Sequence, residues 1–130
     1  MVAAKPVRSK TIKKQHKIKE EDKMKRYGQV IGVKPEKLQE YKELHAAVWP
    51  DILKMITECN LRNYSIYYKN GLLFSYFEYI GNDFELDMKK MADDPLTQKW
   101  WDLCMPCQYV VENAQTGEWW ADMEEVFHVD

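Results

Sequence analysis

The sequence is short of cysteine and of long apolar runs, and each shortage excludes a class of protein. It has 130 residues with three cysteines. So few cysteines, in odd number, do not make the disulfide framework of a small secreted domain. No apolar run approaches the roughly 20 residues of a membrane-spanning helix, and no signal-peptide segment follows the basic start. We therefore expect a soluble, cytoplasmic protein that does not bind a membrane.

Charge is unevenly distributed along the chain. Residues 1–26 carry ten Lys and Arg against three Asp and Glu, whereas the remainder carries nine basic and eighteen acidic residues. A strongly basic segment with few apolar residues cannot bury enough surface to fold alone. We predict a disordered extension at residues 1–24 and one folded domain at 25–130. The extension is interpreted as a dispensable leader, although a nucleic-acid or organelle-targeting tail is the alternative, and no nucleic-acid partner is expected.

The order of the predicted elements indicates the fold class. Strands are predicted at 26–33, 62–69, 72–80 and 123–129. Helices are predicted to begin at Pro35, at Pro50, near residue 82 and at Asp94-Pro95. The resulting β-α-β-β-α-β order is that of an α+β, ferredoxin-like domain with an antiparallel sheet.

The third predicted strand, residues 72–80, is apolar on both faces apart from Ser75 and Glu78. The Asn70-Gly71 pair before it is a strong hairpin signal and joins it to the strand before. A strand with two apolar faces requires a covering layer on each. Helices supply one layer, and a second subunit is the simplest source of the other.

His45 is the first candidate for chemistry. It follows Tyr41 and precedes Trp49 by four residues each, so the three share a face if the helix continues. Imidazole exchanges protons near neutral pH, which suits an acid or base. The alternative is a buried histidine that only bonds a neighbour. Trp100-Trp101 is the second candidate, because indole rings suit the apolar face of a sugar.

The Cys104 and Cys107 pair forms a CxxC pattern that we interpret as structural. A redox pair of this type begins a helix, where the thiolate is stabilised, but this pair ends one. A zinc site requires two further ligands at suitable spacing. We therefore expect no metal and no redox cofactor.

Several motifs, taken in order and spacing, resemble the L-rhamnose mutarotases over roughly residues 25–130. They are Tyr41…His45…Trp49-Pro50-Asp51, Asn63-Tyr64, Gln98-Lys99-Trp100-Trp101 and Glu124-Glu125-Val126-Phe127. The resemblance implies a homodimer in which two ferredoxin-like domains form an α+β barrel. It implies an isomerase that interconverts the α and β anomers of a monosaccharide, L-rhamnose, without a cofactor.

The resemblance also assigns roles by position. It implies that His45 transfers the proton, that Tyr41 and Tyr64 bind the sugar, and that Trp100 and Trp101 form the substrate-binding pair.

One departure from the family's pattern bears on the substrate. Bacterial members often have Asn-Pro after the histidine, where this chain has Ala46-Ala47, so L-fucose or another deoxy-hexose is an alternative substrate. Two other classes stay open, because fold alone does not decide function. One is a non-catalytic sugar-binding or regulatory protein, and the other is a dimeric-barrel oxygenase or haem-handling protein.

Overall fold

The computed structural model describes residues 24–130, so the predicted basic extension lies outside it except for Met24. In chain order the elements are β1 (Lys25–Val33), η2 (Pro35–Lys37), α2 (Leu38–Ala46), α3 (Pro50–Glu58), β2 (Leu61–Lys69), β3 (Leu72–Tyr79), α4 (Phe84–Asp93), α5 (Pro95–Cys104), η3 (Met105–Cys107), β4 (Gln108–Tyr109) and β5 (Ala121–Met123). Within the described part of the chain, no helix is long and apolar enough to cross a membrane.

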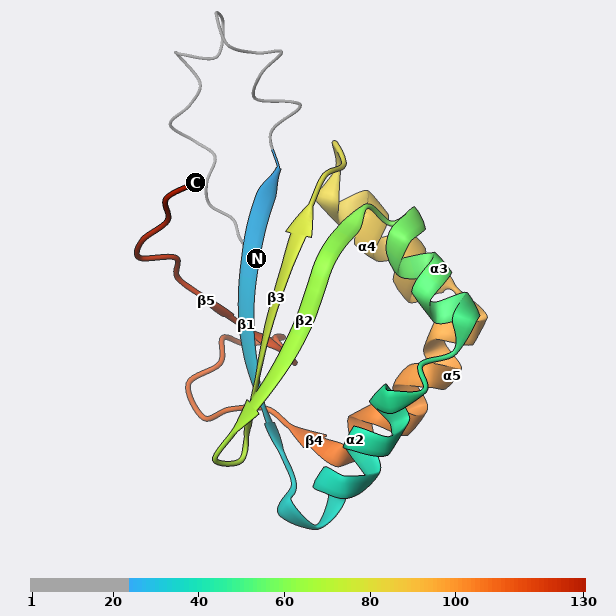
Figure 1. Ribbon diagram of the computed structural model, residues 1–130, viewed down its shortest axis with the longest axis vertical. Helices are drawn as coiled ribbons and strands as arrows, with labels where there is room; N and C mark the ends of the chain where they lie inside the picture. The colour runs from blue at the N-terminus through green and yellow to red at the C-terminus, as the bar shows by residue number, and fades with distance from the viewer. Residues whose placement is uncertain (1–23) are drawn as a thin grey trace, which may run out of the picture.

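The strands form one curled, antiparallel sheet covered by helices on one side (Figure 1). β2 pairs with β3, β3 pairs with β1, and both β4 and β5 pair with the other edge of β1. The predicted α+β class and the first three strands are therefore confirmed.

The predicted last strand, residues 123–129, is wrong. The edge of β1 is instead filled by two short strands, β4 and β5, and residues 124–130 form no strand. The register pairs Gly28 with Met123, which would set Val126 opposite Lys25, where β1 begins. Residues after Val126 therefore have no β1 residue to pair with, despite their alternating apolar pattern. Arg26 instead holds this segment through its ion pair with Glu125, at 3.1 Å.

Local signals set the turns and helix starts. Asn70 and Gly71 both have positive φ, 48° and 82°, which matches the tight hairpin turn that favours this pair. Asp83 and Asp94 accept hydrogen bonds from the backbone amides three residues on and so begin α4 and α5. Such N-caps satisfy donors that a helix start otherwise leaves free. These short-range contacts explain why the sequence predicts these elements well.

Side chains of β3 alternate between the helix layer and the open face of the sheet. The helix-facing residues are all buried: Leu73, Ser75, Phe77 and Tyr79. Leu73 belongs to a core cluster under α2 and α5, whereas Phe77 and Tyr79 belong to a second cluster beside α4. Ser75 lies between the two clusters.

The opposite face of the sheet also carries apolar side chains. By register these are Val30, Leu72, Phe74, Tyr76, Tyr67 and Met123. No helix of the described residues covers this face (Figure 1), and Tyr67 is 67 % exposed. The prediction that β3 is apolar on both faces is therefore confirmed.

Candidate active site

His45 lies in the last turn of α2 and is half-buried. Its Nδ1 is 2.9 Å from the backbone carbonyl oxygen of Tyr41, and the two rings stack with centroids 4.1 Å apart. A carbonyl oxygen can only accept, so Nδ1 carries the hydrogen. In the neutral ring, Nε2 is therefore the unprotonated nitrogen and can accept a proton.

Burial lowers the pKa of His45 below its usual 6.5, although the hydrogen bond to the Tyr41 carbonyl partly opposes this. Desolvation disfavours the charged imidazolium. The ring is consequently neutral at pH 7, with its basic nitrogen available.

The indole of Trp100 joins His45 to Trp49. Trp100 is 6 % exposed, and its ring centroid lies 5.4 Å from His45 and 5.1 Å from Trp49, both edge-on. The helix does not continue from His45 to Trp49 because α2 ends at Ala46 and Trp49 caps α3 with extended backbone. Spacing predicted that His45 and Trp49 share a helix face if the helix continues, and it does not continue. The two side chains instead each contact the ring of Trp100.

Trp101 does not join this group. It is 36 % exposed, and it forms no ring contact with other residues in the range 24–130. Neighbours on a helix point about 100° apart, so burying Trp100 turns Trp101 away. Of the residues predicted near His45, the structure thus brings Tyr41 and Trp100 into ring contact with it.

Tyr64 reaches the helix side of the sheet through an irregularity in β2. The register with β3 shifts between Arg62 and Ser65, so two residues, Asn63 and Tyr64, oppose Phe77 alone. Asn63 has a φ of 52° and bonds outward to Glu78 at 2.7 Å. A bulge of this kind redirects the next side chain.

The ring of Tyr64 packs edge-on against Phe77, with centroids 5.5 Å apart. Although 40 % of Tyr64 is exposed, burial of its hydroxyl raises its pKa to about 12. Burial, and next the nearby Tyr64 hydroxyl, also raise the pKa of Tyr41. Both phenols are therefore protonated at neutral pH, and Tyr64 lies close enough to affect the ionisation of Tyr41.

Gln108 makes two polar contacts that no motif in the sequence indicated. It is 5 % exposed and begins β4. Its Nε2 donates to the Tyr41 hydroxyl at 3.4 Å, and its Oε1 accepts from Trp119 Nε1 at 2.8 Å. Because the Tyr41 hydroxyl accepts from Gln108, its own hydrogen is available for a ligand.

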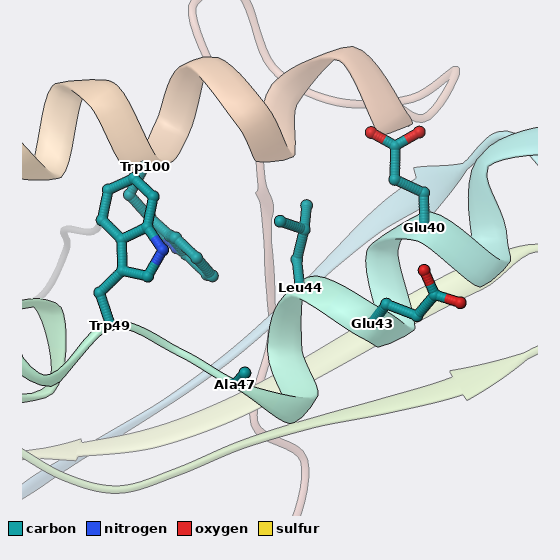
Figure 2. A pocket seen from close by; sticks show the side chains of 6 residues that line it. All are labelled: Glu40, Glu43, Leu44, Ala47, Trp49 and Trp100. Atoms are coloured by element: carbon teal, nitrogen blue, oxygen red, sulfur yellow. The ribbon is translucent and has the colours of Figure 1, made fainter.

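Two cavities flank α2. The first, of about 310 Å³, lies between α2 and the β2–β3 hairpin and is lined by Leu38, Tyr41, Lys42, His45, Ala46, Ile66, Tyr67, Tyr68 and Leu73. The second, of about 240 Å³, lies between α2 and α5. Figure 2 shows Trp49 and Trp100 at one end of the second cavity, Leu44 between, and the carboxylates of Glu40 and Glu43 at the other. The first cavity contains His45, so it is the candidate active site.

The cysteines near this region are free and buried. Cys104 ends α5, as the sequence predicts. Burial raises the pKa of Cys104 to about 12 and also raises that of Cys107, so both are protonated thiols of low reactivity. Across residues 24–130, no three His, Cys, Asp or Glu side chains lie together as a possible metal site.

Comparison with solved structures defines the class of fold. The crystal structure of L-rhamnose mutarotase from Formosa agariphila superposes with a TM-score of 0.64 at 21 % identity, over 82 % of this chain and 99 % of that one. Tetracenomycin F2 cyclase from Streptomyces glaucescens, a type-II polyketide cyclase, superposes with a TM-score of 0.63 at 13 % identity, over 82 % and 97 %. The chain is an α+β protein with the half-barrel sheet that these two share.

Sequence comparison then identifies the family. The L-rhamnose mutarotase family model matches residues 26–129. The L-rhamnose mutarotase of Oceanobacillus iheyensis is 33 % identical over 109 residues, which cover 82 % of this chain and all of that protein. The Bacillus subtilis protein of the same name is 31 % identical over the same shares. The chain belongs to the L-rhamnose mutarotase family.

Proposed function

We propose that this protein interconverts the α and β anomers of L-rhamnose or a related deoxy-hexose, with His45 as the proton-transferring residue. One observation carries the proposal. His45 is a neutral imidazole whose Nδ1 is engaged by the Tyr41 carbonyl and whose Nε2 is a free base, in a cavity lined by aromatic rings. Mutarotation needs one such group and no redox chemistry.

The proposed reaction moves one proton between two oxygens bonded to the same carbon. His45 Nε2 removes the proton from the anomeric hydroxyl while the bond from C1 to the ring oxygen breaks and C1 becomes a carbonyl. The resulting imidazolium delivers that proton to the ring oxygen. After rotation about the C1–C2 bond, the same steps in reverse close the ring on the other face. Acid–base assistance of this kind contributes about 10²–10⁴-fold in rate.

The tyrosines and tryptophans have binding roles in this proposal. Tyr41 and Tyr64 remain protonated at neutral pH, so they donate hydrogen bonds to sugar oxygens and do not act as bases. Trp100, which the resemblance assigns to the sugar, lines the second cavity and contacts the His45 ring edge-on, so its proposed role is to hold that ring in place. Trp101, which lies outside the ring cluster, serves at the edge of the site.

We also propose that the protein is a homodimer in which the open faces of two sheets pack together to form an α+β barrel. The apolar side chains on that face support this, since monomers rarely expose large contiguous apolar patches. The three free cysteines support the predicted cytoplasmic location.

Saturation-transfer NMR tests the proposed reaction directly. The wild-type protein is expected to speed anomer exchange in a panel that includes L-rhamnose and L-fucose. His45→Asn is expected to lose about 10²–10⁴-fold, because its amide can still donate to the Tyr41 carbonyl but has no basic nitrogen. His128→Ala is the control, because His128 lies in the C-terminal segment and bonds Asp130. Unchanged exchange in His45→Asn would remove His45 from the reaction.

A further inference from the structure

A serine in the middle of the sheet's helix-facing side has no partner of its own. Ser75 is 4 % exposed, and its Oγ forms no hydrogen bond with any residue in the range 24–130. Its neighbours on the same face of β3 are Leu73 and Phe77, both buried and apolar. A hydroxyl buried without a hydrogen bond costs free energy that alanine would avoid. The serine therefore calls for an explanation other than packing.

The register places Ser75 beside the His45 cavity. Ser75 pairs with Ile66 of β2, so the two side chains lie on the same face. Leu73 precedes Ser75 on that face by two residues, or about 7 Å. Ile66 and Leu73 both line the cavity that contains His45. Ser75 is thus adjacent to two walls of that cavity, on the side toward the sheet, although it does not line the cavity itself.

Ser75 also lies on the path from the cavity to Tyr64. The next helix-facing residue of β3 is Phe77, whose ring contacts Tyr64. The hydroxyls of Tyr41, Tyr64 and Ser75 consequently come from α2, β2 and β3 and face the same interior. A sugar has several hydroxyls that each donate and accept, so it can satisfy a group of protein hydroxyls together.

We propose that Ser75 Oγ binds one ring hydroxyl of the sugar and so helps to select among deoxy-hexoses. This inference rests on the proposed function. It adds a recognition residue to the site and explains why a polar group occupies an otherwise apolar stretch of β3. A site built to bond a particular hydroxyl discriminates against the analogue that lacks it, because the protein group is then left unpaired.

Ser75→Ala tests the inference, with binding of L-rhamnose, L-fucose and their monodeoxy analogues measured by calorimetry. The variant is expected to bind the preferred sugar about threefold to tenfold more weakly, the effect of one neutral hydrogen bond. Without sugar, its thermal unfolding midpoint is expected to equal or exceed that of wild type, because no protein bond is lost. With the analogue that lacks the bonded hydroxyl, wild type and variant are expected to bind equally.

Ser65→Ala is the matched control. It makes the same chemical change on β2, but Ser65 faces the open side of the sheet opposite Tyr76, and its hydroxyl donates to the Asn63 carbonyl of its own strand. Equal affinities of wild type and Ser75→Ala for every sugar that binds would overturn the inference, because the hydroxyl would then serve the fold or a buried water. A lower unfolding midpoint of sugar-free Ser75→Ala would overturn it also.

Failure of the proposed function gives a different result. If wild type binds a sugar without exchanging its anomers, the proposed reaction fails while the affinity comparison still decides the role of Ser75. If wild type exchanges the anomers and Ser75→Ala binds every sugar with the same affinity as wild type, only the inference about Ser75 fails. If wild type binds no sugar of the panel, both fail.

Discussion

The imidazole Nδ1 of His45 lies 2.9 Å from the carbonyl oxygen of Tyr41, one helical turn earlier. This bond fixes which nitrogen bears the hydrogen and directs the basic Nε2 away from the helix backbone. The same residue pair therefore supplies both the orientation of the base and, through the Tyr41 hydroxyl, a nearby donor.

The pH dependence of anomer exchange is predicted to follow the lowered pKa of His45. Protonation removes the free base, so kcat/KM falls as the pH drops through that pKa. Since burial holds the pKa below 6.5, the rate is expected to fall to half its maximum only at a pH below 6.5. NMR exchange rates, corrected for the spontaneous reaction, measure this profile. A midpoint above 6.5 would contradict the environment described for His45.

Tyr64→Phe is predicted to lower kcat/KM about threefold to tenfold while the fold is retained. The change removes one hydrogen-bond donor and leaves the ring, which keeps its contact with Phe77. Exchange kinetics and circular dichroism measure the two effects. Tyr109→Phe is the control, since Tyr109 lies on β4, is 44 % exposed and does not line the His45 cavity. Equal losses in both variants would argue against a specific role for the Tyr64 hydroxyl.

Trp119→Phe is predicted to lower the free energy of unfolding by about 1–3 kcal/mol. It removes the indole donor to Gln108 and leaves the buried amide oxygen unpaired, which carries a penalty of this size. Urea denaturation measures the change. Trp101→Phe makes the same substitution at an exposed ring and is expected to alter stability by less than about 0.5 kcal/mol. Similar losses in the two variants would mean that the Gln108 bond contributes little.

Phe74→Lys is predicted to convert the proposed homodimer to a monomer. Phe74 lies on the open face of β3, and a charge there would be buried unpaired between two sheets. Light scattering after size exclusion measures the mass. Leu86→Lys is the control, because Leu86 is 60 % exposed on α4, on the helix side. A dimer that persists in Phe74→Lys would place the interface elsewhere.

Elements with local signals were predictable from the sequence, and those that depend on distant contacts were not. The hairpin at Asn70 and Gly71 follows from the positive φ that these residues tolerate. β4 has two residues and exists because β1 offers a pairing edge, which no local pattern encodes. Gln108 likewise gains its role from partners 67 and 11 residues away.

The candidate site was predictable in composition but not in arrangement. Helical spacing placed Tyr41 beside His45, and the structure confirms that contact. Spacing could not show that the helix ends before Trp49, or which of Trp100 and Trp101 is buried. The bulge that turns Tyr64 inward also depends on pairing between strands.

The pairing of β1 has a consequence for synthesis on the ribosome. β1 is the first of the described strands to be made, yet one of its edges pairs with β4 and β5, which are the last of them to be made. At a synthesis rate of about 5–20 residues per second, that edge stays unpaired for several seconds until β4 and β5 are made. An unpaired strand edge is open to other chains during that interval. Translation that stalls before residue 108 would thus leave a nascent chain prone to aggregation.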